Sequence, residues 1–526
     1  MTSGGAVAAG HPLTADAALE VLDAGGSAAD AAIAAAAAAC VVEPVLASLG
    51  GGGFLLWDPA DGEAAVYDFF VDTPLRPKPE TELDFHAAVC DFGTTTQTFH
   101  IGRGAVAVPG MLSGLAELQR TLARLPMMEL LQPARRFARD GFQLSELQAY
   151  ILGIVEPIQA HSPALDTLFR TEEGYRLGAG DNLRQPELAD TLDLLGREGL
   201  RPFQEGEPAA ALLDLMKDGG HLGAEDLKAM RVIHRRPLRR RHAGAEVLTM
   251  PAPSSGGLLT AFALDLAAHL DLGGFGGPDH LIALSRIMTL TDRARQETGL
   301  ADASGETAEE AATRRLADPQ LLQSYARKMS ATPQIVRGTT HISVVDGEGN
   351  LASVSLSNGE GCGYLLPGTG IHLNNMLGEE DLNPRGFHRW PAGVRMGSMM
   401  APTTAVLADG RRVALGSGGS NRLRGAILQV LLNLTDFRHS LSDAVAAPRL
   451  HVEKGIAHAE PGYSEVALNA LDREVSDLQL WRAPNLYFGG VHAVAATPGR
   501  GFEAVGDPRR SGVGRLAKSR GGVGAW

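Results

Sequence analysis

This 526-residue sequence has few cysteines, no long uninterrupted apolar run and no pattern typical of a signal peptide. Its three cysteines, Cys40, Cys90 and Cys362, are too few and too scattered for a disulfide framework or a zinc site. Its main apolar run, residues 29–42, is interrupted by Asp30 and ends before Glu43, so it predicts a buried helix and no membrane span. The first residues lack a charged stretch followed by an apolar one, so we expect no signal peptide and a cytoplasmic location.

Positive charge is also in short supply. The chain has 47 Lys and Arg against 61 Asp and Glu, a formal charge of 47 − 61 = −14. Such a protein repels nucleic-acid phosphates unless it carries a local basic patch. The best patch, residues 231–242, has no interleaved aromatic residue and precedes a strand-like run. We therefore expect no nucleic-acid partner.

Motifs for metal, phosphate and serine chemistry are missing as well. The sixteen histidines form no HExxH or facial-triad pattern, so we predict neither a metal nor any other cofactor. No GxSxG elbow has the required spacing. Four consecutive glycines, residues 50–53, do not match a phosphate-binding loop, and we expect them to pack closely against a sheet.

The pattern of apolar residues predicts a protein that mixes helices and strands. Residues 11–25 predict a helix with Thr14 as a candidate N-cap, and residues 27–42 predict a second helix. Residues 126–330 are mostly helical in pattern. After Gly338, two alternating stretches, 339–345 and 351–356, flank a glycine-rich turn and predict a β-hairpin.

The start of that hairpin has a distinctive chemistry. Gly338 precedes Thr339, which follows a polar stretch and opens a strand. Cleavage of the peptide bond between them would free the α-amine of Thr339, which could then serve as base for its own hydroxyl. Because Gly-Thr-Thr is a common string, this pattern by itself is weak.

A series of motifs, in order along nearly the whole chain, supports the interpretation of Thr339 as a nucleophile. They are HPLTADAALEVLDAGGSAADAAIAAA, VVEPVLASLGGGGFLLW, AVAVPGMLSGL, PAPSSGG, TTHISVVDGEGN, GTGIHLNN, GSGGSNR, APRLH and GDPRRSG. Together they resemble the γ-glutamyltranspeptidase family of N-terminal nucleophile hydrolases.

This resemblance implies a fold and a maturation route. The fold is of the α+β class, a four-layer αββα sandwich. The precursor would cut itself between Gly338 and Thr339, giving a large chain, residues 1–338, and a small chain, residues 339–526, of 526 − 338 = 188 residues. The two chains would form one αββα unit. Thr339 would then attack an amide carbonyl, and water or an amine would release the acyl group.

The resemblance also implies the supporting residues. The oxyanion hole falls on the backbone of Gly418 and Gly419, or of Gly419 and Ser420, depending on the alignment. The substrate-binding positions that match the family are Ser357, Asn358, Glu379, Glu380 and Ser398. We expect His341 to be structural.

Three departures from the family concern the acyl-binding pocket. Phe70 stands where γ-glutamyl enzymes have the arginine that clamps the α-carboxylate, and Met399 and Met376 replace polar residues. An apolar ring cannot supply bidentate pairing to a carboxylate. Arg103 is a candidate replacement cation.

The departures favour an amide hydrolase or acyltransferase with a shifted acyl specificity, such as a glutaryl-type, cephalosporin-type or oxamate-type amide. If the alignment is right, Phe70→Arg should raise activity on γ-glutamyl anilides. A conventional glutathione-cleaving γ-glutamyltransferase is the alternative within the family. An unprocessed, inactive binding protein is the alternative from another class. The expected partners are a small-molecule amide and the two chains of one precursor, and a higher oligomer stays open.

Overall fold

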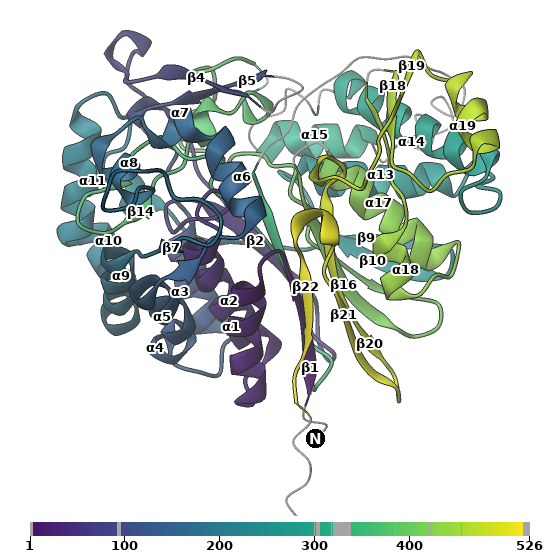
Figure 1. Cartoon of the computed structure of the whole chain (residues 1–526), viewed down its shortest axis with the longest axis horizontal. Coiled ribbons are helices and arrows are strands. Elements are labelled where there is room, and N and C mark those ends of the chain that lie inside the picture. Colours follow the sequence, from purple (N-terminus) through teal and green to yellow (C-terminus); the bar gives the residue numbers. More distant parts are fainter. Residues whose placement is uncertain are drawn as a thin grey trace, which may run out of the picture.

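Two antiparallel sheets, stacked face to face between layers of helices, form the centre of the structure (Figure 1). The structure is a computed structural model. It describes residues 4–91, 96–298, 300, 306–316, 318, 338–383, 385–419, 422–453 and 455–518. This is the four-layer αββα arrangement of the α+β class that the sequence predicts.

The first sheet has seven strands and holds the predicted hairpin. Thr340 pairs with Leu356 across the hairpin, and Ser357 pairs with Gly52 on the next strand. In sheet order the strands are β22 (Val513–Leu516), β1 (Gly5–Ala9), β11 (Thr340–Asp346), β12 (Leu351–Ser357), β2 (Gly52–Asp58), β3 (Ala65–Phe69) and β8 (Ile233–Arg235).

The second sheet has six strands, β21 (Gly501–Val505), β20 (Gly490–Thr497), β16 (Arg412–Gly418), β15 (Thr403–Val406), β10 (Ala245–Thr249) and β9 (Leu238–His242). Smaller sheets lie outside the sandwich. They are β4 (His86–Asp91) with β5 (Thr96–Ile101), β6 (Phe142–Gln143) with β7 (Asn182–Leu183), β13 (Leu365–Leu366) with β14 (Ile371–His372), and β17 (Leu450–Glu453), β18 (Ile456–Ala459) and β19 (Asp477–Leu480).

The layer between the two sheets is thin and partly polar. Its apolar part is built mainly from alanine and valine, namely Ala6, Ala8, Val345, Leu351, Ala414 and Val494. Hydroxyl groups of the first sheet bond across it: Ser343 Oγ donates to the His492 carbonyl at 3.0 Å, and Ser353 Oγ donates to the Leu415 carbonyl at 3.0 Å. Small side chains and satisfied hydroxyls therefore let the sheets approach closely.

The helices of the first outer layer cover the seven-stranded sheet. Every residue of α2 (Ala28–Val42) is buried, as the apolar run predicts, and Ser27 caps it. The remaining helices on this side are α1 (Pro12–Asp23), α3 (Met111–Thr121), α4 (Met127–Leu130), α5 (Gln132–Asp140), α6 (Glu146–Ile154), α7 (Glu156–Gln159), α8 (Pro163–Leu168), α9 (Pro186–Glu198), α10 (Arg201–Glu205), α11 (Glu207–Lys217) and α12 (Ala224–Ala229).

The predicted N-cap of α1 was wrong. His11 precedes the helix and its Nδ1 accepts a hydrogen bond from Leu13 N at 3.2 Å, whereas Thr14 lies in the first turn. The Thr14 hydroxyl instead donates to Glu43 at 2.7 Å. The Thr14 side chain, which the local sequence pattern assigned to capping, therefore binds a residue far away in the sequence.

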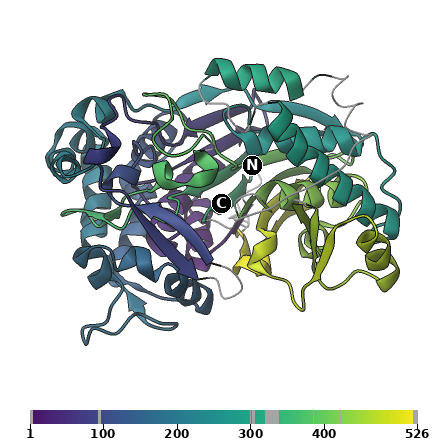
Figure 2. The ribbon, with the colours of Figure 1, turned by 90° about the horizontal axis from the view of Figure 1, so that it is seen from above.

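The second helical layer covers the six-stranded sheet, and the two layers lie on opposite sides in both ribbon views (Figures 1 and 2). It contains α13 (Ser255–Ala267), α14 (Pro278–Glu297), α15 (Glu306–Leu316), α17 (Arg422–Thr435), α18 (Leu441–Ala446) and α19 (Glu465–Asp472). Short 3-10 turns complete the chain at η1 (Glu80–Glu82), η2 (Arg103–Ala105), η3 (Met376–Gly378), η4 (Glu380–Leu382), η5 (Leu486–Phe488) and η6 (Pro508–Arg510).

The four-glycine run packs as the sequence predicts. A Cβ on Gly51 would lie 2.4 Å from the Ser357 carbonyl oxygen, and one on Gly53 would lie 2.4 Å from that of Ser355. Backbone atoms cannot yield at such distances, so only glycine lets β2 lie this close to β12.

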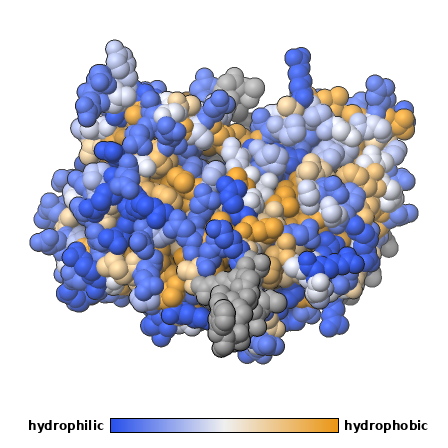
Figure 3. Space-filling model, turned by 60° about the horizontal axis from the view of Figure 1, so that its bottom comes forward, coloured by the Kyte–Doolittle hydropathy of each residue, from blue (hydrophilic) through white to orange (hydrophobic). Residues whose placement is uncertain are grey.

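The surface is mainly polar. The face in Figure 3 is largely hydrophilic with smaller hydrophobic areas between. Arginines of the basic stretch 231–242 are engaged in ion pairs, including Arg235 with Asp68 and Arg240 with Asp265. Within the described ranges, we find no helix with the length and apolar character needed to cross a membrane.

Candidate active site

Thr339 lies directly before β11 at the wall of a large cavity. Its side chain is buried, and the cavity, of about 710 Å³, is also lined by Thr340 and Gly418. The β11–β12 hairpin of the first sheet and the C-terminal end of β16 in the second sheet fix the position of Thr339 from both sides. A nucleophile here would be fixed on rigid strands and would still meet a small molecule.

Gly338, the residue before the peptide bond expected to be cut, is held at both of its backbone groups. The carbonyl oxygen of Gly338 accepts a hydrogen bond from Ser357 Oγ at 2.9 Å. The backbone N–H of Gly338 donates to Glu360 Oε1 at 2.9 Å. A donor on this carbonyl would stabilise the negative charge that develops when a nucleophile attacks it.

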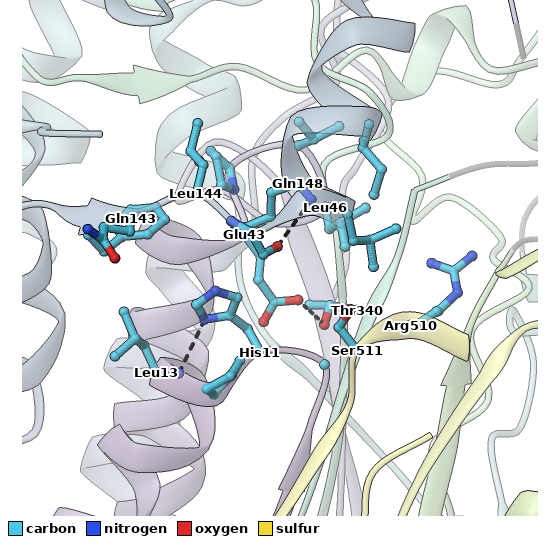
Figure 4. A pocket seen from close by; sticks show the side chains of 18 of the residues that line it. His11, Leu13, Glu43, Leu46, Gln143, Leu144, Gln148, Thr340, Arg510 and Ser511 are labelled. Atoms are coloured by element: carbon cyan, nitrogen blue, oxygen red, sulfur yellow. Dashed lines mark hydrogen bonds between the residues drawn. The ribbon is translucent and has the colours of Figure 1, made fainter. Parts of the chain in front are cut away.

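Glu43 is a buried acid that contacts Thr340, the residue after the candidate nucleophile. It follows α2, and its two carboxylate oxygens accept hydrogen bonds from Thr14 Oγ1 at 2.7 Å and from Thr340 Oγ1 at 2.6 Å. Burial raises the pKa of Glu43 above its ordinary value, against the opposing effects of these hydroxyls and of Arg510. Glu43 therefore connects α1 and α2 to the residue after Thr339. Figure 4 shows its contact with Thr340.

His341 has a structural place, as expected. Its Nδ1 contacts Ser355 Oγ at 2.8 Å and its Nε2 contacts Ser343 Oγ at 2.9 Å. Burial holds its pKa well below the usual range. A Cβ on Gly416 would lie 2.3 Å from the ring, so glycine in β16 makes room for the imidazole. The ring fills the gap between the two sheets.

The glycine-rich segment after β16 approaches the nucleophile closely. A Cβ on Gly418 would lie 2.3 Å from the carbonyl oxygen of Thr339, and Gly419 has φ of +120°. Ser417 Oγ donates to the Gly418 carbonyl at 2.8 Å and so fixes the turn. Ser420, the third oxyanion candidate, lies outside the described residues.

Arg510 places a free cation beside this segment. Its Nη1 and Nη2 would each lie 3.2 Å from a Cβ on Gly418 and on Gly419, respectively. Within the described part of the chain its side chain has no ion pair, and its buried Nε has no hydrogen-bond partner. Burial lowers its pKa to about 10, so it stays charged at neutral pH.

A buried ion-pair framework holds Arg510 in place. Arg449 pairs with Asp507 at 2.5 Å, and Arg509 pairs with Glu460 at 2.5 Å and with Asp507 at 3.2 Å. Because the neighbouring Arg509 on η6 is paired in this way, Arg510 is the arginine of this motif that faces the cavity.

The rest of the cavity is mostly apolar. Figure 4 shows Arg510 on one side, His11, Gln143 and Leu144 on the other, and Glu43 between them. The apolar lining residues are Pro12, Leu13, Pro44, Val45, Leu46, Phe137, Phe142, Leu144, Leu147, Ile151, Leu152 and Leu486.

The predicted clamp position is closed. Phe70 is 1% exposed and stacks on Phe54 with ring centroids 5.4 Å apart. Met376 belongs to the same hydrophobic cluster, and Met399 is buried in the core of the second sheet. The three apolar substitutions thus sit in packed surroundings, and none of them lines the cavity.

The predicted acidic residues differ in burial. Glu379 is buried, and its Oε1 would lie 3.0 Å from a Cβ on Gly359, whose carbonyl would lie 3.0 Å from a Cβ on Gly338. Glu380 is exposed. Asn358 is buried, and its side-chain oxygen and nitrogen have no hydrogen-bond partner in the described residues. Glu379 and Asn358 therefore lie close behind the cleavage site.

Ser398 and Arg103 are engaged elsewhere. Ser398 Oγ is buried and accepts from Met400 N at 3.1 Å. The Arg103 guanidinium donates to the Asp218 carbonyl at 2.5 Å and lies 4.6 Å from the Tyr364 ring centroid. Neither residue lines the cavity, and the cation that does so beside Thr339 is Arg510.

Glu43 and Arg510 stand within motifs that carry the family resemblance, but neither was predicted as a site residue. Glu43 is the only charged residue in its otherwise apolar and glycine-rich motif, which is a signal that could have found it, whereas Arg510 stands in a motif with two other charged residues. Glu360, by contrast, has no sequence signal, because its contact with Gly338 depends on the turn after β12.

Comparisons with known proteins show the family to which this chain belongs. The sequence model of the family described as Gamma-glutamyltranspeptidase matches residues 14–517. The Acylase ACY 1 proenzyme of Pseudomonas sp. (strain V22) is 32% identical, over 94% of this chain and 90% of that protein. The glutathione hydrolase proenzyme of Pseudomonas aeruginosa is 30% identical, over 98% of this chain and 95% of that protein.

A solved structure shares the fold. The crystal structure of a cephalosporin acylase from Bacillus halodurans superposes with a TM-score of 0.81 at 24% identity, covering 99% of this chain and 96% of that one. The αββα arrangement is therefore common to both proteins.

Proposed function

This chain belongs to the γ-glutamyltranspeptidase family and is an amide hydrolase or acyltransferase, and on that premise we propose that Thr339 is its catalytic nucleophile. The observation that carries the proposal is the position of Thr339, between a held Gly338 carbonyl on one side and a cavity of about 710 Å³ on the other. The hydroxyl of Thr339 can therefore attack the Gly338 carbonyl in maturation and a substrate amide in turnover.

In maturation, Thr339 Oγ attacks the Gly338 carbonyl carbon while Ser357 Oγ stabilises the oxyanion. The acyl group moves from nitrogen to oxygen, and water hydrolyses the resulting ester. The products are chains of residues 1–338 and 339–526, and the latter begins with a free α-amine. That amine then acts as the base for the hydroxyl of Thr339.

In turnover, the hydroxyl attacks the substrate amide and the backbone N–H groups beside Gly418 and Gly419 receive the oxyanion. Their closeness to Thr339 supports this role. Removal of one such donor typically slows an enzyme by about 10²–10³-fold. The amine leaves, and water or an acceptor amine takes the acyl group.

The cavity supports an acyl group other than a free γ-glutamyl group. Its apolar walls suit a carbon chain, and Arg510 offers a cation for a carboxylate, as in a glutaryl-type acyl group. Phe70, at the position that matches the family's clamping arginine, is packed in the core and offers no cation to the α-carboxylate of glutamate. The substrate we propose is thus a small amide whose acyl group is apolar with a terminal acid.

The mass of the purified protein under denaturing conditions tests the nucleophile. Wild type should give two chains split between Gly338 and Thr339, and Thr339→Ala a single inactive chain. Thr339→Ser is the matched control, since it keeps a hydroxyl and should still be cut. A Thr339→Ala protein that is still cleaved and active would show that Thr339 is not the nucleophile.

A pair of anilides tests the acyl group. We expect glutaryl-p-nitroanilide to be a better substrate than γ-glutamyl-p-nitroanilide. Arg510→Met should lower kcat/KM about 10–100-fold for the glutaryl compound, because a charged hydrogen bond contributes about 1.5–3 kcal/mol. Uncharged pentanoyl-p-nitroanilide should change little. Equal losses on both would mean that Arg510 supports the oxyanion segment instead.

The conventional glutathione-cleaving activity remains the second candidate. The buried position of Glu379 close behind Gly338 favours it, because the family's acid binds the substrate's amino group there. Preference for the γ-glutamyl anilide in the same assay would select it. A cytoplasmic location stays a further proposal, supported by three cysteines that are all free and buried.

A further inference from the structure

Three metal-binding side chains meet outside the active site. Asp84, His86 and His161 each offer one ligand atom, and these atoms lie within 4.8 Å of one another. His86 is the first residue of β4, Asp84 lies two residues before it, and His161 follows α7, which packs on β4 (Figure 1). None of the three lines the cavity at Thr339.

We propose that Asp84, His86 and His161 form a Zn²⁺ site that clamps the β4–β5 hairpin onto the α7–α8 connection. Two imidazoles and one carboxylate are a donor set that Zn²⁺ accepts, whereas Mg²⁺ and Ca²⁺ prefer oxygen ligands alone. Three protein ligands leave the fourth tetrahedral position to water. The sequence shows no metal motif because the ligands come from two distant segments.

The surroundings of the three side chains fit a ligand role. The Nε2 atom of His161 is buried and has no hydrogen-bond partner among the described residues. The second oxygen of Asp84 accepts from Arg103 N at 3.1 Å, which is the outer contact that orients a ligating carboxylate. The His86 side chain is 55% exposed and leaves an entry path for the ion.

Binding requires small side-chain rotations. His86 Nε2 and Asp84 Oδ1 now share a hydrogen bond of 2.5 Å, whereas ligands of a tetrahedral zinc ion lie about 3.3 Å apart. The ion replaces the hydrogen bond and draws His161 inward. Arg103 Nε lies 3.7 Å from Asp84 Oδ2, and its positive charge opposes a second cation. We therefore expect a dissociation constant in the micromolar range or somewhat tighter.

Titration of the tag-free, chelator-treated full chain with Zn²⁺ and with Co²⁺ tests the site. We expect one ion per chain by calorimetry, a rise in the thermal unfolding temperature with Zn²⁺ but not Mg²⁺, and visible Co²⁺ absorption typical of tetrahedral geometry. Absence of stoichiometric Zn²⁺ binding by wild type would overturn the proposal.

Variants separate this site from adventitious binding. His86→Ala removes an exposed ligand and should weaken Zn²⁺ binding at least tenfold without unfolding the protein, and His161→Gln should do the same. His269→Ala is the matched control, since that exposed ring lies just after α13 and contacts the carbonyl of Asp265 in the last turn of the helix. Unchanged affinity in both ligand variants, or equal loss in the control, would contradict the site.

Discussion

Three ionisable side chains around Thr339 are held in three different ways. His341 is buried and its pKa is held well below its usual range, so its ring is neutral and serves as a spacer. Arg510 is charged, and in the described structure its Nε has no hydrogen-bond partner. Glu43 is buried between two threonine hydroxyls, and its protonation state can be tested directly.

For Glu43 the test is the pH dependence of stability. Burial raises its folded-state pKa, so the protonated form is favoured on folding, and the stabilisation is lost as pH rises through the folded pKa. Glu43→Gln mimics the neutral form. In the single-chain Thr339→Ala background, the Gln variant should gain stability relative to Glu43 as pH increases between the unfolded and folded pKa values, by about 1.4 kcal/mol for each pH unit.

Urea unfolding at several pH values between about 4 and 8 measures this difference. Glu20→Gln is the control, because Glu20 is an exposed partner of Arg136. A difference between Glu43 and Gln that stays constant across pH would contradict a raised pKa.

Ser357 gives a kinetic prediction at the same scale. Its hydroxyl is the donor that the structure places on the Gly338 carbonyl. Ser357→Ala should slow self-cleavage by about 10²–10³-fold, and Ser357→Thr should restore most of the rate. A time course of chain separation on denaturing gels measures the rate. Cleavage of the alanine variant at the wild-type rate would show that another donor stabilises the oxyanion.

At the scale of elements, the end of β16 and the start of β11 approach too closely for any side chain between them. Gly418→Ala would place a Cβ 2.3 Å from the Thr339 carbonyl oxygen. We expect it to reduce cleavage and turnover at least a hundredfold while the far-ultraviolet circular dichroism stays that of wild type. Gly153→Ala in α6 is the control, since nothing lies within 4 Å of its Cβ. Normal activity of Gly418→Ala would disprove the close approach.

The packing around β3 changes the expectation for Phe70→Arg. The sequence predicted a gain of γ-glutamyl activity, but Phe70 is 1% exposed, stacks on Phe54 and does not line the cavity at Thr339. An arginine there would bury an unpaired charge. We now expect a loss of several kcal/mol in stability and no gain in activity. Thermal unfolding measures the stability of the variant, and the γ-glutamyl anilide assay measures its activity. A stable and more active variant would support the gain of activity that the sequence predicted.

At the scale of the whole molecule, both sheets are composites of the two proposed chains. The first sheet combines β1, β2, β3 and β8 with β11, β12 and β22, and the second combines β9 and β10 with the remaining strands. Cleavage after Gly338 therefore cuts a connection and leaves the sheets intact.

The mature protein should consequently behave as one particle in native buffer. Size-exclusion chromatography should elute both chains together at the position of the uncut Thr339→Ala protein, and only denaturant should separate them. Separation of the chains in native buffer would mean that the strands rearrange after cleavage.

Local patterns in the sequence were enough for much of the fold. The alternating stretches after Gly338 predicted β11 and β12, and the alanine-rich run predicted the buried α2, because both depend on neighbours a few residues away. The order of motifs predicted the family. Thr14 shows the limit of such reasoning, because its hydroxyl donates a hydrogen bond to Glu43 and does not cap the helix.

The sequence by itself thus determined the elements, the family and the candidate nucleophile. Only the tertiary structure decided which side of Thr339 is open, that Phe70 is packed away, that the Nε of Arg510 has no hydrogen-bond partner in the described structure, and that Asp84, His86 and His161 meet. The physical reason is that cavities and unpaired charges arise from segments far apart in the chain, whose contacts no local pattern records.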